Sequence, residues 1–561
     1  MIHHISEHVY AYPVSPDTLN VRIKVKKDLY ERISVHYKNL YDHTPHIKEK
    51  EMSLILEDEK YRIYEASISV KERHFKYYFK LEKVGEAIHY TADGLKKEIA
   101  PENFFYYPAI NLDDVPEFPG WAEGEIIYQV LIDRFHDGNP RNNPEKLKDI
   151  HELPDRNTYY GGDFAGLIQK LDYVKSLGVK LLYLSPLFSS PTYHKYDVDD
   201  YYKIDSVYGS EEELKELVGC AHERGIKVIL DGVFNHCSSE NPLFQNVLKN
   251  GENSPYKDWF YIENFPVDPA KLNYDSFAGQ VPSMPRFNTS NPEVIDYLCE
   301  AACHWTEKLG IDGWRFDVAD EVASGFWREM RKRLRKIKKD VILIGEVWNQ
   351  AGKWLQGDQL DTVTNYKYRQ YLLEFIDGKL TSKEFFNQLN ALKSLYKTPF
   401  HNYLVNLLGS HDTIRLATYL KRRHPDALRL HYLSLAVTLA MAGMPLIYYG
   451  DEIALEGDVD PDNRRAFLWE RTEEKPVQEL KKLARFRAAS EILKKGSLIP
   501  LDLDERVLAF RRAYGGESLL VLANFADAPK EVGVKAREIV YGNAEIGDNV
   551  LLDKYAFTIL K

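Results

Sequence analysis

The chain has 561 residues, of which 44% are hydrophobic and 28% charged, a composition typical of a globular protein with two to four domains. Its formal net charge of -11 argues against nucleic acid or an anionic membrane as the main partner, because either would favour a basic face. No run approaches the roughly 18 apolar residues of a membrane helix, and no signal-like leader precedes the start MIHHISEHVYAYP. We therefore expect a cytoplasmic protein.

The N-terminal part of the chain has the pattern of β-strands. Apolar and polar residues alternate between short polar turns in LNVRIKVKK, RISVHYKNLY, YRIYEASISV and FKYYFKLEKV. A proline-containing segment with little periodicity follows at 106–124 and is typical of a linker. Residues 1–120 are predicted to form an antiparallel β-sandwich module plus a linker.

From residue 121 onward, short apolar runs alternate with amphipathic helical stretches. The series begins EIIYQVLIDRF, GLIQKLDYVKSLG, VKLLYLSP, EEELKELVGCAHERG and IKVILDGVF, which predicts parallel strands joined by crossover helices. Eight such strands, the last at MPLIYYG, predict a central (β/α)8 TIM barrel over residues 121–494.

Two further segments depart from the barrel rhythm. The stretch 235–290, after the third strand, is rich in Asn, Pro and aromatic residues, and its length predicts an inserted domain within the barrel. After the last barrel helix a β pattern returns in VLAFRRAYG, SLLVLANF and KYAFTIL, so residues 495–561 are predicted to form a C-terminal antiparallel β domain.

The cysteines do not predict a disulfide framework. Cys220, Cys237, Cys299 and Cys303 show neither a CxxC pair nor the density of a secreted scaffold. Cys299 and Cys303 lie one helical turn apart in an apolar pattern, which favours core thiols over a metal site.

Polar residues stand at the carboxyl ends of several predicted barrel strands. The third strand ends in DGVFNH, the fourth carries GWRFDVADE, the fifth ends in GEVW and the seventh in LLGSHD. These ends form one rim of a TIM barrel. Any single carboxylate there could be a turn former or a helix cap, but barrel strands are otherwise apolar. Together Asp317, Glu346 and Asp412 predict a catalytic pocket.

Carboxylates among aromatic and histidine residues favour glycoside hydrolysis. Arg315 and Asp317 are two residues apart in a strand and share a face, where the cation would lower the pKa of the carboxyl, as a nucleophile requires. Glu346 is flanked by Val347 and Trp348, an apolar neighbourhood that would raise its pKa, as a general acid requires.

The four segments DGVFNH, GWRFDVADE, GEVW and NLLGSHD resemble the ordered signature regions of the alpha-amylase family of glycoside hydrolases. The resemblance implies that Asp317 is the nucleophile, Glu346 the general acid/base and Asp412 the stabiliser of the transition state. It also implies polar contacts to the sugar in the cleavage subsite from Arg315, His236 and His411.

Other segments are similar to the cyclomaltodextrinase, neopullulanase and maltogenic amylase subgroup of that family. These are LFSSPTYHKYDVDDYYKID, MPRFNTSNPEV and a DPDNRR segment. The resemblance implies a sugar stacked on Tyr196. The other candidate substrate contacts are His194, Asp460, Arg464 and Trp348. A loop salt bridge is the structural alternative for Asp460 and Arg464, and a core tryptophan is the alternative for Trp348.

The chain departs from the subgroup in two places. It has VADE after the proposed nucleophile, where the subgroup usually has VANE, so Asp320 replaces an amide near the acceptor side. MPRFN also differs from the MPKLN-type sequence at two positions. The preference for acceptor sugars is therefore left open.

The segment DGNPRNN, followed by YGGD, resembles a calcium site of the family. Oxygen ligands at short, irregular spacing with a backbone carbonyl are what calcium accepts. An Asn/Gly/Pro turn without an ion is the alternative. The candidate ligands of a structural calcium are Asp137, Asn139, Asn142, Asn143, Gly161 and Asp163.

The resemblance implies a retaining hydrolase that cleaves α-1,4 bonds in cyclodextrins, pullulan and maltooligosaccharides, with transfer to sugar acceptors as a second outcome. An α-1,6-acting or mainly transferring relative is the alternative among enzymes. A non-catalytic glucan-binding protein on an amylase fold is the alternative from another class. The N-terminal module resembles modules that pair with the barrel of a second subunit, which implies a homodimer.

Overall fold

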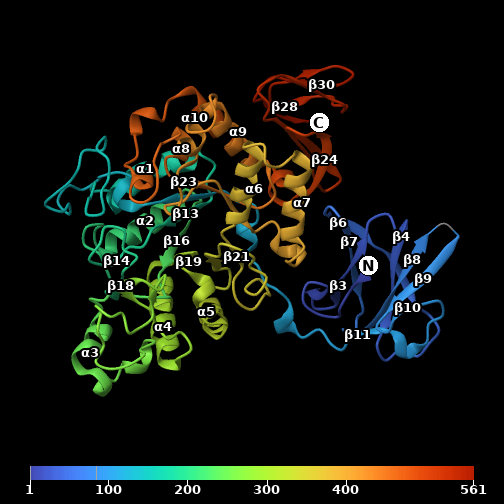
Figure 1. Cartoon of the computed structure of the whole chain (residues 1–561), viewed down its shortest axis with the longest axis horizontal. Coiled ribbons are helices and arrows are strands. Elements are labelled where there is room, and N and C mark those ends of the chain that lie inside the picture. Colours follow the sequence, from blue (N-terminus) through green and yellow to red (C-terminus); the bar gives the residue numbers. More distant parts are fainter. Residues whose placement is uncertain (1, 84) are drawn as a thin grey trace. The chain divides into compact units, whose positions relative to one another are not determined.

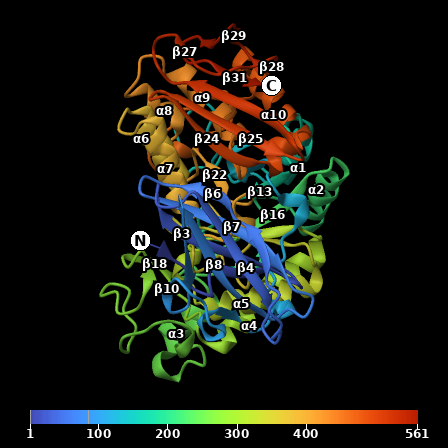
Figure 2. The same cartoon turned by 90° about the vertical axis from the view of Figure 1, so that its right-hand side faces the viewer.

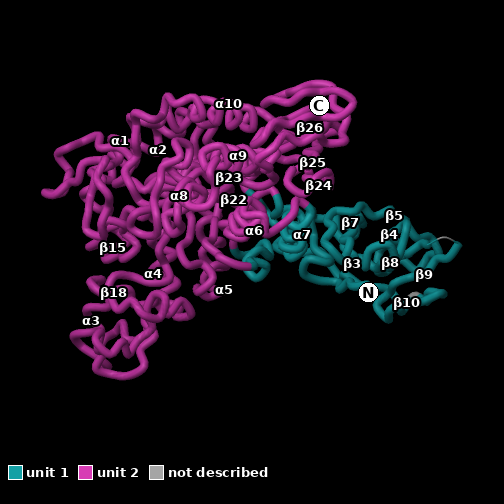
Figure 3. The backbone as a smooth tube through the Cα atoms, turned by 45° about the horizontal axis from the view of Figure 1, so that its top comes forward, with its two compact units in different colours: residues 1–118, 350–359, 383–401 teal, residues 119–349, 360–382, 402–561 magenta. Residues whose placement is uncertain are grey.

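The computed structural model describes residues 2–83 and 85–561 (Figure 1). The chain divides into two compact units (Figure 3). The first comprises the chain up to Phe118 together with 350–359 and 383–401, and the second comprises 119–349, 360–382 and 402–561. Two short segments from the barrel region of the sequence therefore belong to the first unit.

The N-terminal module is built from short antiparallel strands, several of which lie side by side in Figure 2. Their bounds are β1 (Ile2–His3), β2 (Ala11–Ser15), β3 (Thr18–Lys26), β4 (Arg32–Asn39), β5 (Lys48–Glu51), β6 (Ser53–Glu57), β7 (Tyr61–Ser69), β8 (Phe75–Lys83), β9 (Glu86–Thr91), β10 (Gly94–Lys96) and β11 (Phe105–Tyr107). One sheet has the order β1-β3-β7-β6 with β2 beside β3, and the other has the order β10-β9-β8-β4-β5 with β11 beside β8. The predicted β-sandwich is confirmed.

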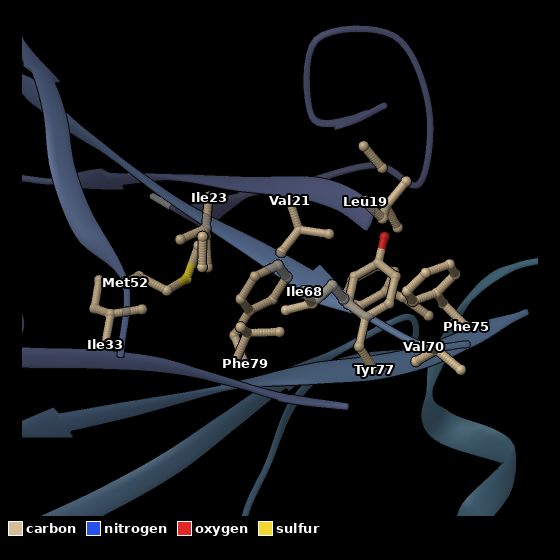
Figure 4. Close-up of a cluster of buried hydrophobic side chains, with 14 of the residues drawn as sticks. Leu19, Val21, Ile23, Ile33, Met52, Ile68, Val70, Phe75, Tyr77 and Phe79 are labelled. Atoms are coloured by element: carbon tan, nitrogen blue, oxygen red, sulfur yellow. The ribbon is translucent and has the colours of Figure 1, made fainter. Parts of the chain in front are cut away.

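The two sheets share an apolar core (Figure 4). Val21 and Ile23 on β3 face Phe79 on β8 across it, and all three side chains are fully buried. Alternate residues of each strand supply these contacts, as the period of two in the sequence predicts. The intervening residues of β8 therefore face away from the core.

A buried ion pair ties the segment 383–401 to the sandwich. Arg22 Nε donates to Glu65 Oε2 at 2.6 Å, and the guanidinium also donates to the Tyr396 carbonyl at 2.8 Å and to Thr398 Oγ1 at 2.7 Å. A buried charge is stable when it is paired and fully hydrogen-bonded, which these contacts achieve. The network accounts for the grouping of this segment with the first unit.

The second unit contains the predicted barrel. Its strands are β12 (Ile127–Val130), β13 (Leu181–Leu184), β16 (Lys227–Gly232), β19 (Gly313–Phe316), β20 (Ile342–Gly345), β21 (Thr362–Val363), β22 (Val405–Leu407) and β23 (Met444–Tyr448). They pair in parallel in the order β21-β20-β19-β16-β13-β12-β23-β22. A parallel bridge between Thr364 and Val405 joins the two ends of this order and closes the barrel. The (β/α)8 prediction is confirmed.

Helices follow the strands, and most begin at a polar cap. Their bounds are α1 (Phe164–Ser176), α2 (Glu211–Glu223), α3 (Pro242–Asn250), α4 (Pro292–Leu309), α5 (Ser324–Ile337), α6 (Tyr366–Ile376), α7 (Ser382–Lys393), α8 (Leu416–Lys421), α9 (Ala427–Ala440), α10 (Lys475–Ala489) and α11 (Glu491–Lys495). Ser210 and Glu213 form a capping box at α2, and Asn291 precedes a proline at the first position of α4.

The long segment after β16 has secondary structure of its own. It contains α3 and the paired strands β17 (Ser276–Phe277) and β18 (Val281–Pro285), drawn in green in Figure 1, and it returns to the barrel at α4. A smaller pair, β14 (Phe188–Ser189) and β15 (Asp200–Ile204), follows β13.

The C-terminal β domain is antiparallel, as predicted. Its strands are β24 (Ser497–Asp504), β25 (Val507–Tyr514), β26 (Glu517–Asn524), β27 (Lys530–Val532), β28 (Ile539–Gly542), β29 (Glu545–Ile546), β30 (Val550–Leu552) and β31 (Phe557–Leu560). They form sheets of order β24-β25-β26-β31-β28 and β27-β30-β29 around a buried cluster that includes Val507, Leu522 and Val550.

Within residues 2–83 and 85–561, no helix has both the length and the apolar character needed to cross a membrane. The cysteines are free thiols. Cys299 is buried, as predicted for a core thiol, whereas Cys303 is only partly buried, so the prediction holds for Cys299 alone.

Candidate active site

The carboxyl ends of neighbouring barrel strands place the predicted carboxylates around one arginine. Arg315 on β19 is the register partner of Asp231 on β16, and its guanidinium Nη1 lies 2.8 Å from Asp231 Oδ1 and 2.9 Å from Asp317 Oδ1. Its Nη2 lies 2.8 Å from Glu346 Oε2, just beyond the end of β20. Arg315 is 2% exposed, so these ion pairs form away from solvent.

The alternation predicted for GWRFDVADE is present. Trp314 and Phe316 are fully buried, and the Trp314 indole donates to Thr306 Oγ1 on α4 at 2.9 Å. The apolar residues of β19 therefore pack outward against a helix while Arg315 and Asp317 lie on the opposite face.

Burial raises the pKa of Asp317 well above its ordinary value. Arg315 acts in the opposite direction, but the nearby carboxylates of Glu346, Asp231 and Asp412 add to the increase. The sequence predicted a lowered pKa from Arg315 alone. That prediction is wrong in its net sign, because one cation is shared among several buried carboxylates.

The neighbourhood of Glu346 is polar, contrary to the sequence prediction. Oε2 receives the Arg315 guanidinium and a hydrogen bond from the Val318 amide at 3.0 Å. Oε1 receives the indole N–H of Trp348 at 3.2 Å and lies 3.5 Å from the Tyr366 hydroxyl. The flanking Trp348 thus supplies a donor rather than an apolar wall, and the other donors come from residues far from Glu346 in the sequence.

The backbone of Val318 has an unusual conformation at the contact with Glu346. Its φ is 45°, in the left-handed region that a β-branched residue rarely occupies. Its amide donates to the Glu346 side chain, and the amide of the next residue, Ala319, donates to the Glu346 backbone carbonyl at 3.1 Å. Strain of this kind is concentrated at functional sites. Periodicity in the sequence carries no signal for it.

Trp348 and Tyr366 form an aromatic pair beside Glu346. Their rings stack with centroids 3.8 Å apart and planes 5° from parallel, and Trp348 remains 43% exposed. An exposed indole that touches the candidate acid is suited to contact a sugar ring. The alternative of a core tryptophan does not fit this exposure.

Asp231 anchors the floor of the site. It is fully buried and accepts hydrogen bonds from the hydroxyls of Tyr183 at 2.6 Å and Tyr196 at 2.9 Å, besides its contact with Arg315. The Tyr196 ring stacks on His411 with centroids 4.9 Å apart. Sequence reasoning did not assign Tyr183; its signal was a tyrosine within the apolar strand VKLLYLSP.

The three predicted histidines contact the same group of residues. The His236 Nε2–H donates to the Tyr196 carbonyl at 3.1 Å, and the Tyr196 amide donates to His194 Nδ1 at 3.0 Å. His411 Nδ1 lies 2.9 Å from Gln129 Nε2, and His411 Nε2 lies 3.0 Å from Asp412 Oδ2.

Burial keeps these histidines neutral. It lowers the pKa of His194 to about 3 and that of His236 to about 4, and it lowers the pKa of His411 well below its ordinary value. Arg464 reinforces the effect at His194 and His411. Near neutral pH the three rings act as uncharged hydrogen-bonding groups.

Asp412 lies at the barrel rim, next to the DPDNRR segment. Its carboxylate is 31% exposed, and Arg464 Nη2 lies 3.6 Å from Oδ1. Desolvation raises the pKa of Asp412, which Arg464 and Arg315 oppose. Arg464 also pairs with Asp460 at 3.1 Å and donates to the His411 carbonyl at 3.0 Å. The loop salt bridge considered as an alternative exists, and it connects to Asp412.

Asp320 lies half-buried in a short 3-10 turn, Ala319–Glu321, directly after Val318. Burial raises its pKa, and the charges of Glu346 and Glu321 add to the increase. Asp320, which differs from the subgroup sequence, therefore lies close enough to Glu346 for the two charges to interact.

The predicted calcium segment forms a loop that caps α1. Asp163 Oδ1 accepts the amides of Gly138 and Gly166, and Oδ2 accepts the Asn139 amide at 2.9 Å and Asn142 Nδ2 at 3.2 Å. Asp163 is thus the N-cap of the helix and holds the loop with four donors. Its oxygens are engaged, as is Asn139 Oδ1, which accepts the Arg141 amide at 3.3 Å.

Three oxygens of the same loop have no donor. Asp137 Oδ1, Asn142 Oδ1 and Asn143 Oδ1 are buried and accept no hydrogen bond from any described residue. Gly161, at φ 82°, lies so close that a Cβ atom would come within 2.7 Å of Asn143 Oδ1. Among the described residues, no group of three or more His, Cys, Asp or Glu forms a metal cluster. An amide-rich set of hard oxygens fits calcium better than a transition metal.

Replacing Arg315 with methionine is expected to lower the free energy of unfolding by about 3–5 kcal/mol, because buried carboxylates would lose their counter-charge. Urea unfolding followed by circular dichroism measures the change. Arg422→Met is the matched control: Arg422 is 51% exposed and pairs with Asp458, so its loss should cost less than about 1 kcal/mol. Equal losses in the two variants would contradict the prediction.

Three carboxylates beside one arginine at the rim of a TIM barrel define the site of a glycoside hydrolase. The family described as alpha amylase, catalytic domain, matches residues 129–491, and alpha amylase, N-terminal ig-like domain, matches residues 1–111. The chain belongs to the alpha-amylase family.

Relatives and solved structures agree with this assignment. The chain is 39% identical to a cyclomaltodextrinase of Thermoanaerobacter pseudethanolicus, over 93% of this chain and 92% of that protein. It is 38% identical to neopullulanase 2 of Thermoactinomyces vulgaris, over 93% and 90%. A solved cyclomaltodextrinase structure superposes with a TM-score of 0.92 at 34% identity and covers 100% of this chain and 99% of its own.

Proposed function

We propose that the chain is a retaining α-glucan hydrolase that cleaves α-1,4 bonds in cyclodextrins, pullulan and maltooligosaccharides. The observation that carries the proposal is the grouping of Asp317, Glu346 and Asp412 at one barrel rim, with Arg315 in contact with the first two. The names of the relatives, cyclomaltodextrinase and neopullulanase, support the choice of substrates.

The hydrogen bonds suggest which oxygens react. Arg315 holds Asp317 Oδ1, so Oδ2 is the oxygen proposed to attack the anomeric carbon. Glu346 Oε2 is held by Arg315 and Val318, so Oε1 is the oxygen proposed to give its proton to the leaving group. The glycosyl-enzyme on Asp317 is then resolved when Glu346 takes a proton from water or from an acceptor sugar.

The remaining residues position the sugar in this proposal. Tyr196, fixed by Asp231 and stacked on His411, offers a ring face at the cleavage subsite. Asp412, whose charge acts on Asp317, is proposed to stabilise the oxocarbenium-like transition state. Asp460 and Arg464 are proposed to hold the non-reducing side of the substrate, and Asp320 to contact the acceptor side.

Initial rates on β-cyclodextrin, pullulan, maltotriose and isomaltose test the substrate class, and proton NMR of the first product tests the stereochemistry. We expect hydrolysis of the first three and an α-anomer as the initial product. A β-anomer, or cleavage of isomaltose alone, would contradict the proposal. The ratio of transfer products to hydrolysis products in the same reactions distinguishes a hydrolase from a mainly transferring enzyme.

The pH profile of the hydrolase is expected to reflect Asp317 on its acid side. The nucleophile must be ionised, and burial raises its pKa, so kcat/KM on β-cyclodextrin should fall as the pH drops through a midpoint well above the ordinary pKa of an aspartate. His194 and His236, with pKa values of about 3 and 4, are neutral over that range. A His194→Gln variant should therefore keep the midpoint of the pH profile. A shift of that midpoint by a full pH unit would instead show that a histidine causes the loss of activity at low pH.

We propose calcium as a structural ion of the α1 loop. The three donor-free oxygens, Asp137 Oδ1, Asn142 Oδ1 and Asn143 Oδ1, support it, with the Gly161 carbonyl as a further candidate. Calcium would neutralise the Asp137 carboxylate and satisfy the two buried amide oxygens. Asp163 and Asn139 then shape the loop through their own hydrogen bonds.

Removal of calcium with a chelator is expected to lower the melting temperature by about 5 °C, because an ion bound at a hundred times its Kd stabilises a protein by about 2.7 kcal/mol. Differential scanning calorimetry measures the shift. Asp137→Ala should abolish the response to calcium, whereas Asp149→Ala, at an exposed position of the same loop, should keep it. A chelator with no effect on the wild-type chain would contradict the proposal.

We also propose a homodimer formed through the N-terminal module and a cytoplasmic location. Exposed apolar side chains on that module, Tyr41 at 67% and Leu54 at 48%, are available for an interface. A relative in Bacillus subtilis named intracellular maltogenic amylase, 34% identical, supports the location. Sedimentation equilibrium tests the assembly; a constant mass of 65.2 kDa across concentrations would contradict it.

A further inference from the structure

Two lysines lie opposite each other on the outer face of the N-terminal sandwich. Lys38 on β4 and Lys76 on β8 are register partners in an antiparallel pair. Phe75, Tyr77 and Phe79 of β8 point into the core in Figure 4, so Lys76 lies on the other face. The two ammonium groups therefore share one side of the sheet.

This pair is unfavourable as it stands. Like charges at directly opposite positions of an antiparallel pair destabilise a sheet. Lys76 is 6% exposed, and its ammonium group makes no hydrogen bond or ion pair with any residue that the structure describes. Lys38 donates to the Thr44 carbonyl, which supplies no negative charge. Desolvation lowers the pKa of Lys76 and Lys38 adds to the decrease. An anion held between the two ammonium groups would offset their repulsion.

The space in front of the lysines is a cavity of about 400 Å³. Its lining combines cationic and aromatic side chains, among them Lys38, Lys76, His43, Tyr78 and Phe104. The Phe104 ring packs edge-on against Tyr78 with centroids 5.1 Å apart, which fixes an apolar wall beside the charges.

One carboxylate, that of Asp42, also lines this cavity. It accepts the Thr44 amide at 2.8 Å, which holds it to its own turn, and it forms no ion pair with another described residue. Its charge raises the pKa of Lys76 only as the smallest of the three contributions. A single carboxylate facing two lysines leaves the cavity cationic.

We propose that this cavity binds a phosphate group, carried on a sugar or free in solution. A tetrahedral dianion accepts hydrogen bonds from both ammonium groups at once and relieves their repulsion. The volume falls within the range of small-molecule sites, about 300–1,000 Å³, which leaves room for a sugar ring against Tyr78 and Phe104. A neutral glucan would leave the lysine pair unrelieved. This site is independent of the hydrolytic function proposed above.

Isothermal titration calorimetry of the full chain tests the proposal with glucose 6-phosphate, inorganic phosphate and glucose at constant ionic strength. We expect binding of both phosphate compounds and no binding of glucose. A tenfold preference for glucose 6-phosphate would identify a sugar phosphate as the source, and equal affinities would identify the free ion. Lys76→Met should weaken the binding of both at least tenfold. No heat from either compound, or unchanged affinity in Lys76→Met, would overturn the proposal.

Lys80→Met is the matched control. Lys80 lies on the same face of β8, but it pairs with Glu82 at 2.7 Å, so its loss should leave phosphate binding unchanged. Thermal melts supply a second readout. Without phosphate, Lys76→Met should melt no lower than the wild-type chain, because it removes one of two like charges that lie opposite each other. It should also lose the rise in melting temperature that phosphate gives the wild type. A purely structural lysine would instead lower the melting temperature and leave the response to phosphate intact.

Discussion

Replacing Asp317 with asparagine is expected to lower the turnover of β-cyclodextrin by at least about 10⁴-fold, because an amide cannot form the glycosyl-enzyme. The substitution keeps the shape of the side chain and removes one of the carboxylates that crowd Arg315. We therefore expect the variant to fold and to bind β-cyclodextrin. Steady-state hydrolysis and calorimetric binding of the same substrate measure the two effects separately.

Asp320→Asn is the matched control for this substitution. Asp320 lies three residues further along the chain and is half-buried, and we propose that it contacts the acceptor side. Its loss should change kcat by less than about tenfold and should alter the ratio of transfer to hydrolysis. If Asp317→Asn kept a tenth of the wild-type rate, or if Asp320→Asn were as inactive as Asp317→Asn, the assignment of the nucleophile would be wrong.

The position of the site followed from the sequence because one geometric rule governs it. The carboxyl ends of parallel barrel strands meet at one rim, so four short segments separated by tens of residues were expected to converge. The period of two within GWRFDVADE placed Arg315 beside Asp317 and turned Trp314 outward. The structure has both features, with Arg315 and Asp317 2.9 Å apart.

The electrostatics did not follow, because they depend on side chains from other strands and on a local backbone conformation that the sequence pattern does not reveal. Asp231 takes part of the Arg315 charge from β16, and the Val318 amide reaches Glu346 from a backbone conformation with φ 45°. The opposition of Lys38 and Lys76 was equally hidden, since it depends on the register of two strands that are far apart in the sequence. Register and shared counter-charges are properties of the folded chain.

The second large effect is expected at Glu346. Glutamine at this position keeps an oxygen for Arg315 and the Val318 amide, but it has no proton to give to the leaving group. Hydrolysis of β-cyclodextrin should fall by about 10²–10⁴-fold. A maltoside of 4-nitrophenol needs little protonation because its leaving group is a weak base, so the first step of its cleavage should be largely spared.

The loss of the general base should then expose the covalent intermediate. With the nitrophenyl maltoside, Glu346→Gln is expected to release a burst of nitrophenol and then turn over slowly, since water is no longer activated for the second step. Mass spectrometry of the quenched protein should find the added sugar on the peptide that contains Asp317. Glu321→Gln, with a side chain 42% exposed in the same turn, should show neither change. Equal losses on the cyclodextrin and the nitrophenyl substrate would place Glu346 outside proton transfer, because an acid that assists the leaving group must matter more when that group is a strong base.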